Sequence, residues 1–369
     1  MTLPEELALL MRPAGGGVYL VSTGLAEQVA FQERYYAASG QEEVQRRFRE
    51  RLARVAEARA VLIGIPSDTG AGSVRGANMG PQAIRQRLLE QDPGWRDRAE
   101  AAGLLDLGDV FVVPQLLHDE MLSAGQKLAT RRAIYPGLSA QERRSLPVSP
   151  LSMAERALSL VLQANPAVKP IVLGGDHSTA WPVVRALVAA RPGLAVVQID
   201  AHTDLLEERL GVKYCFGTWS FHANALLGRG GRLVQVGIRA SGHDRAHWEQ
   251  HLDVRQFWAR DVRADPAAAV DGIVEAVKRS GAEAVYFSND IDGTDASWAD
   301  ATGTPEPGGL TPDFVVELVQ RLGREVGLAG GDVMEVAPLI ARTPGGAERT
   351  LDTAVRYLRE TVAAAIGPV

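Results

Sequence analysis

Short and almost uninterrupted apolar runs recur along the chain, and each one ends at a glycine, a proline or a polar residue. The clearest are AVLIGIP (60–66), PIVLGG (170–175), LAVVQID (194–200), RLVQVGI (232–238) and AVYFSND (284–290). Apolar residues follow one another in these runs instead of alternating with polar ones, which is the pattern of strands buried on both faces of a parallel sheet. We therefore predict a central parallel β-sheet.

Segments with apolar residues at helical spacing separate these runs. Examples are AERALSLVLQANP (154–166), WPVVRALVAARP (181–192) and PAAAVDGIVEAVKRSG (266–281). Strands and helices that alternate at crossover length are typical of a doubly wound α/β domain.

The chain contains no clear linker that would divide it into two globular parts. Residues 26–60 are rich in Gln, Glu, Arg and Ala and predict one or two surface helices, and residues 110–150 are the least regular stretch. We expect a helical N-terminal extension over residues 1–58, followed by a single catalytic domain over residues 59–369.

The composition limits the classes of partner. Hydrophobic residues make up 46% of the chain, charged residues 23%, and the net charge is −6. These values are ordinary for a soluble globular protein and argue against nucleic acid or an anionic membrane surface as the main partner. No segment approaches the roughly 20 apolar residues of a membrane helix. The single cysteine, Cys215, fits a reducing compartment, so we expect a cytoplasmic protein.

Acidic residues and histidines gather at the ends of three predicted strands, in the motifs GGDHS (174–178), DAHTD (200–204) and SNDID (288–292). Functional residues in open parallel sheets collect at the carboxyl ends of the strands. If the chain stays extended past each strand, alternate residues point the same way. The candidate metal ligands are His177, Asp200, His202, Asp204, Asp290 and Asp292.

The charges of these candidate ligands predict cations. Four carboxylates crowded into one crevice would repel each other and take up protons, whereas two divalent cations would neutralise them. Carboxylates and imidazoles without thiolate suit Mn²⁺, with Zn²⁺, Ni²⁺ or Fe²⁺ as alternatives. Two ions about 3.5–4 Å apart can share a water and convert it to hydroxide at neutral pH. The motifs therefore indicate metal-assisted hydrolysis.

These three motifs, in this order, resemble the metal motifs of the ureohydrolase family, the arginases, agmatinases and their relatives. The resemblance extends from Val61 to Pro338 and includes GIPSDTGAGSVRGANMGPQAIR (64–85), TGTPEPGGLTP (302–312) and GGDVMEVAP (330–338). It implies an arginase-like, three-layer α/β/α fold around a parallel sheet of about eight strands. It also implies a homo-oligomer, commonly a trimer or hexamer.

The resemblance implies roles for individual residues and two Mn²⁺ ions per subunit. One ion would be held by His177, Asp200, Asp204 and Asp290, and the other by Asp200, His202, Asp290 and Asp292. Glu335 would bind the guanidinium group of the substrate, and Asp204 would also steer the nucleophile. The implied reaction is hydrolysis of a guanidino C–N bond, which releases urea and an amine.

The chain departs from the agmatinase-like pattern at Phe216, where those members usually carry a histidine before Gly-Thr. The nearest histidine in sequence is His222, which we predict to be the catalytic proton shuttle because imidazole titrates near neutrality. The alternative is that His222 is a helix or core residue with satisfied hydrogen bonds. His243, His247 and His251 would share one helix face, which we interpret as a solvated surface.

Several functions remain compatible with the sequence. Besides an agmatinase or arginase type of hydrolase, the chain could act on free guanidine, a guanidino acid or formimidoyl-glutamate. It could also be a metal-binding protein that is not an enzyme. Such a protein would have kept the metal ligands but lost proton transfer, because Phe216 stands where the histidine would be. The substrate tail is recognised by loops, and loop sequences carry no portable code.

Overall fold

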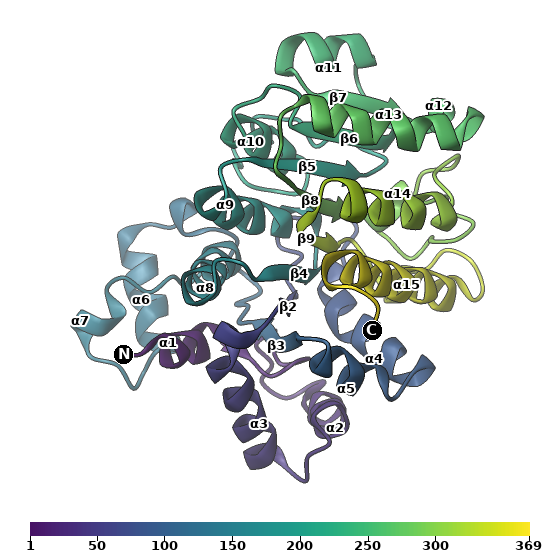
Figure 1. The fold of residues 1–369 in the computed structure, drawn as a ribbon. Coiled ribbons are helices and arrows are strands. Elements are labelled where there is room, and N and C mark those ends of the chain that lie inside the picture. Colours follow the sequence, from purple (N-terminus) through teal and green to yellow (C-terminus); the bar gives the residue numbers. More distant parts are fainter.

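A computed structural model describes residues 1–369, and a nine-stranded sheet forms the centre of the molecule (Figure 1). The order of the strands across the sheet is β1-β3-β2-β4-β9-β8-β5-β6-β7. The strands are β1 (Met11–Arg12), β2 (Ala60–Ile65), β3 (Leu104–Val110), β4 (Lys169–Gly174), β5 (Leu194–Ile199), β6 (Leu233–Ile238), β7 (Arg255–Trp258), β8 (Ala284–Asn289) and β9 (Leu328–Val333).

All neighbouring strands in the sheet are parallel except β1 and β3. The prediction of a parallel sheet of about eight strands is therefore confirmed for β2 to β9. The additional strand, β1, comes from the N-terminal extension and pairs antiparallel through Met11↔Val110 and Arg12↔Asp109. A strand of two residues is too short to leave a hydrophobic pattern, so the sequence did not predict it.

Helices cover both faces of the sheet and complete the three-layer architecture (Figure 1). One apolar core receives side chains from α1 (Leu3–Leu10), α2 (Leu25–Tyr36), α3 (Gln41–Ala53), α8 (Pro150–Ala164), α9 (Ala180–Ala190), α10 (Trp219–Leu226) and α11 (Arg245–Leu252). The opposite core receives them from α4 (Gly80–Gln91), α5 (Trp95–Ala101), α12 (Ala259–Ala264), α13 (Pro266–Arg279), α14 (Pro312–Glu325) and α15 (Gly346–Ile366). The connection from β3 to α8 contains α6 (Ala124–Ile134) and α7 (Ala140–Arg143).

Consecutive residues of each central strand enter opposite cores. In β5, Val196 lies in the first core and Val197 in the second, and both are fully buried. Successive side chains of a strand point to opposite faces of a sheet, so a strand covered on both faces needs apolar residues at every position. None of the surrounding helices combines the length and the apolarity that a membrane span requires.

The N-terminal extension shares the first apolar core with the sheet. Leu7, Leu10 and Phe48 are at most 2% exposed and belong to the same cluster as the strand residues Val61 and Leu107. The division between an extension over residues 1–58 and a catalytic domain over residues 59–369 stays a prediction. In the structure the extension is part of the core packing.

A buried ion cluster joins the extension to the sheet. The Arg85 guanidinium is fully buried and donates to Asp106 at 2.8 and 2.9 Å and to Asp109 at 2.5 Å. From the extension, Tyr35 donates its hydroxyl hydrogen bond to Asp106, and the Gly15 amide donates to Asp109 at 2.7 Å. Each charge is therefore paired, which is the condition for keeping ions inside a protein.

Candidate metal centre

The three His/Asp motifs lie at the carboxyl ends of strands β4, β5 and β8, on the same side of the parallel sheet. Each motif contains an aspartate whose carboxylate accepts a hydrogen bond from the backbone N–H two residues later. These aspartates are Asp176, Asp200 and Asp290, with N···O distances of 2.9, 2.7 and 2.9 Å. Such Asx turns fix the direction in which the chain leaves the strand. The repeated turn is the local reason why the motifs converge.

The first group of candidate ligands surrounds His177, which lies in the short helix η4 (His177–Thr179). Its Nδ1 atom lies 3.1 Å from Oδ2 of Asp200 and 3.1 Å from Oδ2 of Asp290. Oδ2 of Asp204 lies 3.5 Å from the same nitrogen. The structure thus brings together the four residues that the sequence predicts for one ion.

The second group surrounds His202. Its Nδ1 atom lies 3.1 Å from Oδ2 of Asp292 and 3.5 Å from Oδ1 of Asp200. Asp200 therefore presents Oδ2 to the first group and Oδ1 to the second. Asp290 joins only the first group, while its Oδ1 atom accepts from the Asp292 amide, so its role as a second bridge stays a prediction.

The backbone reaches this convergence differently from the sequence-based expectation. An extended chain is confirmed at His202, which forms a parallel bridge with Ala240. It is wrong at Asp204, whose φ of 50° lies in the left-handed region, and after Asp290, where the short helix η5 (Ile291–Gly293) begins. A non-glycine residue at positive φ is strained, and such strain is often found at functional sites.

The site has the chemistry of a cation site. Nδ1 of His177 is buried and makes no well-directed hydrogen bond, although three carboxylate oxygens lie within 3.5 Å of it. These atoms converge on a common point instead of pairing with each other. The donor set of carboxylates and imidazoles therefore fits hard or borderline divalent cations.

The electrostatics of the same residues show how strongly the site attracts positive charge. Burial alone would lower the pKa of His177, but the neighbouring carboxylates of Asp200 and Asp290 raise that pKa well above its ordinary value. Burial opposes the shift at His202 too, yet Asp200 and Asp292 raise its pKa to about 12. Burial and the charge of Asp200 raise the pKa of Asp204. Protons and metal ions would compete for these positions.

Neighbouring side chains orient two of the candidate ligands. Nε2 of His177 lies 3.0 Å from the Ser288 hydroxyl, which lies 2.9 Å from the Asp332 carboxylate. Because the carboxylate accepts from the serine, the serine accepts from Nε2–H, and the lone pair of Nδ1 is left for a metal. On the other side, the Trp219 indole N–H donates to Oδ2 of Asp204 at 3.0 Å.

A chain of buried side-chain amides leads from Asp200, after β5, across β6 to the outermost strand, β7. Gln198 donates to Oδ2 of Asp200 at 2.7 Å and accepts from Gln235 at 2.8 Å. Gln235 in turn accepts from Gln256 at 2.8 Å, and Gln256 accepts from the Trp258 indole at 3.0 Å. An indole can only donate and a carboxylate can only accept, so the orientation of every amide between them is fixed. Neither composition nor motif spacing indicated this chain.

Glu335 lies beside the first group of ligands. Its Oε1 atom accepts a hydrogen bond from the His177 backbone N–H at 2.9 Å, and its φ is 60°. Burial, together with the charges of Asp290 and Asp176, raises the pKa of Glu335 well above its ordinary value. A buried carboxylate in this position favours a cationic partner.

His222 makes its hydrogen bonds away from the candidate ligands. It lies in α10, and its Nε2 atom lies 3.0 Å from the backbone oxygens of both Glu207 and Lys213. Burial lowers the pKa of His222. These contacts tie two interior points of the loop between β5 and α10 to that helix. The role of His222 as a proton shuttle stays a prediction.

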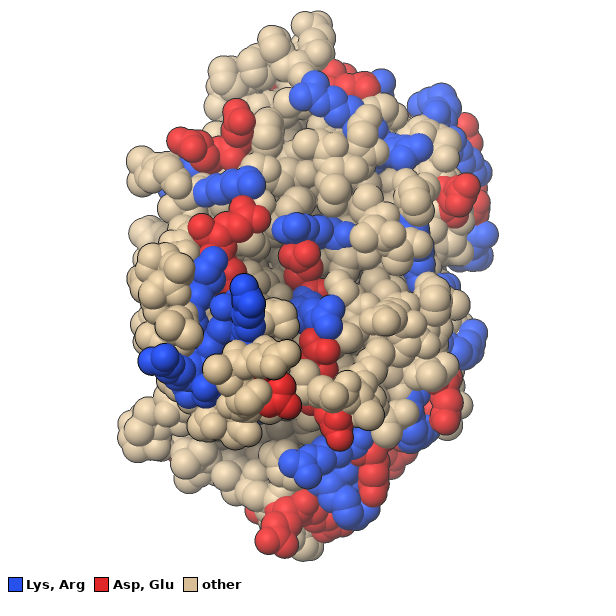
Figure 2. Space-filling view, turned by 90° about the vertical axis from the view of Figure 1, so that its left-hand side faces the viewer, with Lys and Arg blue, Asp and Glu red and all other residues tan.

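His247 and His251 lie on α11, whereas His243 precedes the helix, so the prediction of one shared helix face is wrong for His243. The rings of His243 and His247 stack with centroids 3.9 Å apart, and those of His247 and His251 with centroids 4.3 Å apart. His243 and His251 are exposed and His247 is partly exposed, in agreement with a solvated surface. Figure 2 shows that Lys, Arg, Asp and Glu side chains all occur on one face of the molecule, with several basic side chains side by side at its left.

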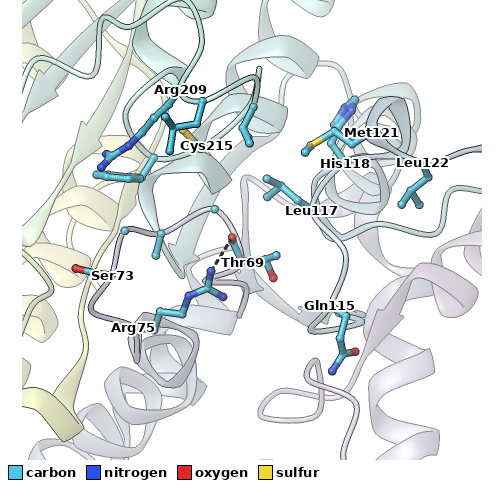
Figure 3. A pocket seen from close by; sticks show the side chains of 16 residues that line it. Thr69, Ser73, Arg75, Gln115, Leu117, His118, Met121, Leu122, Arg209 and Cys215 are labelled. Carbon is cyan, nitrogen blue, oxygen red and sulfur yellow. Dashed lines mark hydrogen bonds between the residues drawn. The ribbon is translucent and has the colours of Figure 1, made fainter.

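A cavity of about 500 Å³ opens beside the metal centre, between the loop after β2 and the loop after β5 (Figure 3). Gly70, in its wall, donates its N–H to Asp176 at 3.0 Å and accepts from the Phe216 N–H at 3.1 Å. A side chain at Gly70 would meet Ser178 Oγ at 2.5 Å, so glycine allows the loop to lie against the His177 motif. Cys215 is buried in the same wall.

The fold and this site define an α/β class whose parallel sheet presents a histidine–aspartate centre for divalent cations at the ends of its strands. A family model described as the arginase family matches residues 58–363. The chain therefore belongs to the arginase family.

Individual relatives support this assignment. The chain is 31% identical over 292 residues to the mitochondrial agmatinase of Gallus gallus, covering 76% of this chain and 74% of that protein. It is 28% identical to the guanidinobutyrase of Pseudomonas aeruginosa, covering 76% and 79%. The solved structure of proclavaminate amidinohydrolase from Streptomyces clavuligerus superposes with a TM-score of 0.62 at 28% identity, covering 83% of this chain and 92% of that one.

Proposed function

We propose that this chain hydrolyses a guanidino C–N bond with two Mn²⁺ ions per subunit and releases urea and an amine. Membership of the arginase family makes it a hydrolase of C–N bonds in linear amidines with a divalent metal site. The observation that carries the proposal is the position of Asp200, whose two oxygens face two different ligand groups. One carboxylate shared by two groups is the arrangement expected for a pair of ions.

We propose the ligand assignment that the geometry supports. His177, Asp200, Asp204 and Asp290 would hold one ion, and His202 and Asp292, with Asp200, the other. When bound, the two cations supply Lewis acidity and lower the pKa of water. The Trp219 indole holds Asp204, and the chain of glutamines holds Asp200, so these carboxylates are oriented before substrate arrives.

Glu335 is proposed to bind the guanidinium group. Its carboxylate is 8% exposed and is fixed by the His177 backbone N–H, so one oxygen remains for the substrate. A planar guanidinium donates to carboxylate oxygens with fixed geometry. The guanidinium group would thus be held next to the first ligand group, because Glu335 is bonded to the backbone of His177.

Asp204 is proposed as the residue that orients the nucleophilic water, because its Oδ2 atom faces the first group and is held by Trp219. The departing amine must gain a proton. His222 is the candidate that the sequence predicts, and its hydrogen bonds to Glu207 and Lys213 support a second role in holding the loop. A homo-oligomer, a trimer or hexamer, and a cytoplasmic location remain part of the proposal.

The experiment is a urea-release assay over a panel of guanidino compounds with Mn²⁺ and then with Ni²⁺. The panel contains arginine, agmatine, 4-guanidinobutyrate, free guanidine and formimidoyl-glutamate, the last followed as formamide release. We expect metal-dependent turnover of at least one guanidino compound, and loss of that turnover in Asp290→Ala. A protein that binds two ions and turns over no compound would be the metal-binding non-enzyme instead.

A further inference from the structure

The cavity beside the metal centre has an unusual charge pattern for a pocket of an acidic protein. Its wall contains two arginines, Arg75 and Arg209, one histidine, His118, and no aspartate or glutamate. The rest of the wall is mainly glycine and apolar side chains, including Leu117, Met121, Leu122, Leu210, Val212 and Phe216. The net charge of the whole chain is −6, so the positive lining is a local feature.

Neither arginine has a carboxylate partner. Arg75 makes one long hydrogen bond, from Nη2 to the Thr69 backbone oxygen at 3.4 Å, and Arg209 stacks on the Phe216 ring with 4.9 Å to the centroid. Figure 3 shows the Arg75 guanidinium under the loop that carries Thr69 and the Arg209 guanidinium across the opening from it. Both side chains are exposed at the cavity. A guanidinium without a carboxylate partner is suited to bind a carboxylate, so two of them at one cavity favour an anionic occupant.

Three acidic residues near the cavity in sequence are engaged elsewhere, and the exposed Glu207 and Glu208, which precede Arg209, form no ion pair with it. Glu120 pairs with Lys213 at 3.3 Å, and Asp119 accepts from the backbone N–H groups of Val148 and Ser149 at 3.2 and 2.9 Å. Asp68 accepts from the Gly76 amide at 2.9 Å. None of these carboxylates therefore neutralises Arg75 or Arg209.

The wall of the cavity packs against residues next to the metal centre. Gly70 contacts Asp176 and Ser178, the residues on either side of His177. Cys215 and Phe216 precede Trp219, which holds Asp204. A substrate whose reacting group lies at the ligand groups would therefore extend its other end into this cavity. The apolar residues of the wall suit methylene groups, and the two arginines belong to the same wall.

We infer that the substrate is a guanidino or amidino compound whose far end carries a carboxylate, which Arg75 and Arg209 bind. The inference rests on the proposed function and names the class of substrate for the same site. Phe216 acts as a platform that orients the Arg209 guanidinium, because a cation over an aromatic face is held by the ring quadrupole. Arg75 and Arg209 are thus specificity-determining residues.

The test compares three substrates with the same guanidino head and a tail of similar length. These are 4-guanidinobutyrate, butylguanidine and agmatine, with anionic, neutral and cationic tails. We expect wild-type kcat/KM to be highest for the acid. Arg75→Gln and Arg209→Gln should each lower kcat/KM for the acid roughly tenfold to a hundredfold, because a hydrogen bond to a charged group contributes about 1.5–3 kcal/mol. Neither should change kcat/KM for butylguanidine.

The control is Arg279→Gln, an exposed arginine at the end of α13, which should leave all three values unchanged. Equal melting temperatures of the variants show that both arginines can be replaced without unfolding. A wild-type preference for the neutral or cationic tail would overturn the inference while leaving the proposed function intact.

If no compound is turned over, the proposed function fails, and binding decides the inference separately. Isothermal titration of the Mn²⁺-loaded protein should then show binding of 4-guanidinobutyrate that butylguanidine does not match and that Arg75→Gln and Arg209→Gln weaken. Equal affinity for the acid and the neutral compound, or unchanged affinity in both variants, would overturn it.

Discussion

The side-chain amide of Gln198 donates a hydrogen bond of 2.7 Å to Asp200, the carboxylate that both ligand groups share. Gln198 is completely buried and also accepts from Ser220 and Gln235, each at 2.8 Å. The amide therefore cannot rotate without breaking other buried hydrogen bonds. A ligand held in this way is already oriented when the ion arrives.

Replacing Gln198 by leucine removes this support while keeping the size of the side chain. We expect Gln198→Leu to weaken Mn²⁺ binding by about 10–100-fold, the usual effect of removing a hydrogen bond to a metal ligand. Titration of the metal-free protein with Mn²⁺ measures it. Gln256→Leu, at the far end of the amide chain, should have a smaller effect, and equal losses in both variants would contradict the positioning role.

Metal binding should release protons. The raised pKa of His177, and that of His202 at about 12, mean that both imidazoles are protonated at pH 7 without cations. A metal needs the neutral imidazole, so affinity should rise with pH and protons should pass to the buffer. Calorimetry in buffers of different ionisation enthalpy measures the number of protons released per ion bound.

About two ions per subunit should bind. Elemental analysis of the metal-loaded protein measures this stoichiometry, and a saturating value of one or none would contradict the paired site.

Glu335→Gln should damage substrate binding and leave the ions in place. The amide oxygen of glutamine can still accept from the His177 N–H, so the local backbone is kept. The loss of the negative charge opposite a buried guanidinium should cost about 3 kcal/mol, or about a hundredfold in kcat/KM. Metal content is the second measurement. A variant with wild-type kcat/KM on the best substrate would exclude the proposed role.

The buried ion cluster around Arg85 should dominate the stability of the N-terminal extension. Arg85→Met leaves Asp106 and Asp109 buried without their cation, which should lower the free energy of unfolding by about 3–5 kcal/mol. Denaturant titration measures the loss, and faster proteolysis within residues 1–58 should accompany it. The matched control is Arg87→Met on the same helix. Arg87 is partly exposed in its pair with Asp352 and should cost less than about 1 kcal/mol.

His222→Asn separates the two roles proposed for His222. A proton shuttle predicts a fall in kcat of about 10²–10⁴-fold with little change in metal affinity, and the loss of one limb of the pH–rate profile. A role in the loop alone predicts an unchanged profile, because the carbonyls of Glu207 and Lys213 can be bound by an asparagine amide. In that outcome the departing amine takes its proton from water.

The sequence predicted those parts of the fold in which burial is purely apolar. It found β2, β4, β5, β6 and β8, but not β3 or β7, and β9 was indicated only through the family resemblance. Strand β3 contains Asp106 and Asp109, and their partner Arg85 lies in helix α4. In β9, Asp332 is buried because Tyr286 and Ser288 donate to it. A buried charge is read correctly only when its partner is known, and partners distant in sequence are not visible in a local pattern.

The candidate site was predictable for a related reason. All six candidate ligands stand within short motifs at strand ends, and the parallel sheet aligns those ends without further information. The amide chain was not predictable, because it joins side chains of β5, β6 and β7 whose mutual register appears only when the strands are paired. The arginines of the cavity come from two loops that meet only in space.

The sheet ends on both sides in its shortest strands. Strand β1 has two residues and β7 has four, whereas the strands between them have six or seven. A long free edge offers unpaired N–H and C=O groups to another molecule, and short edges deny that template. The N-terminal segment occupies the end of the β3 edge at Asp109 and Val110, and the two short outer strands offer little template for a sheet that would continue into another subunit.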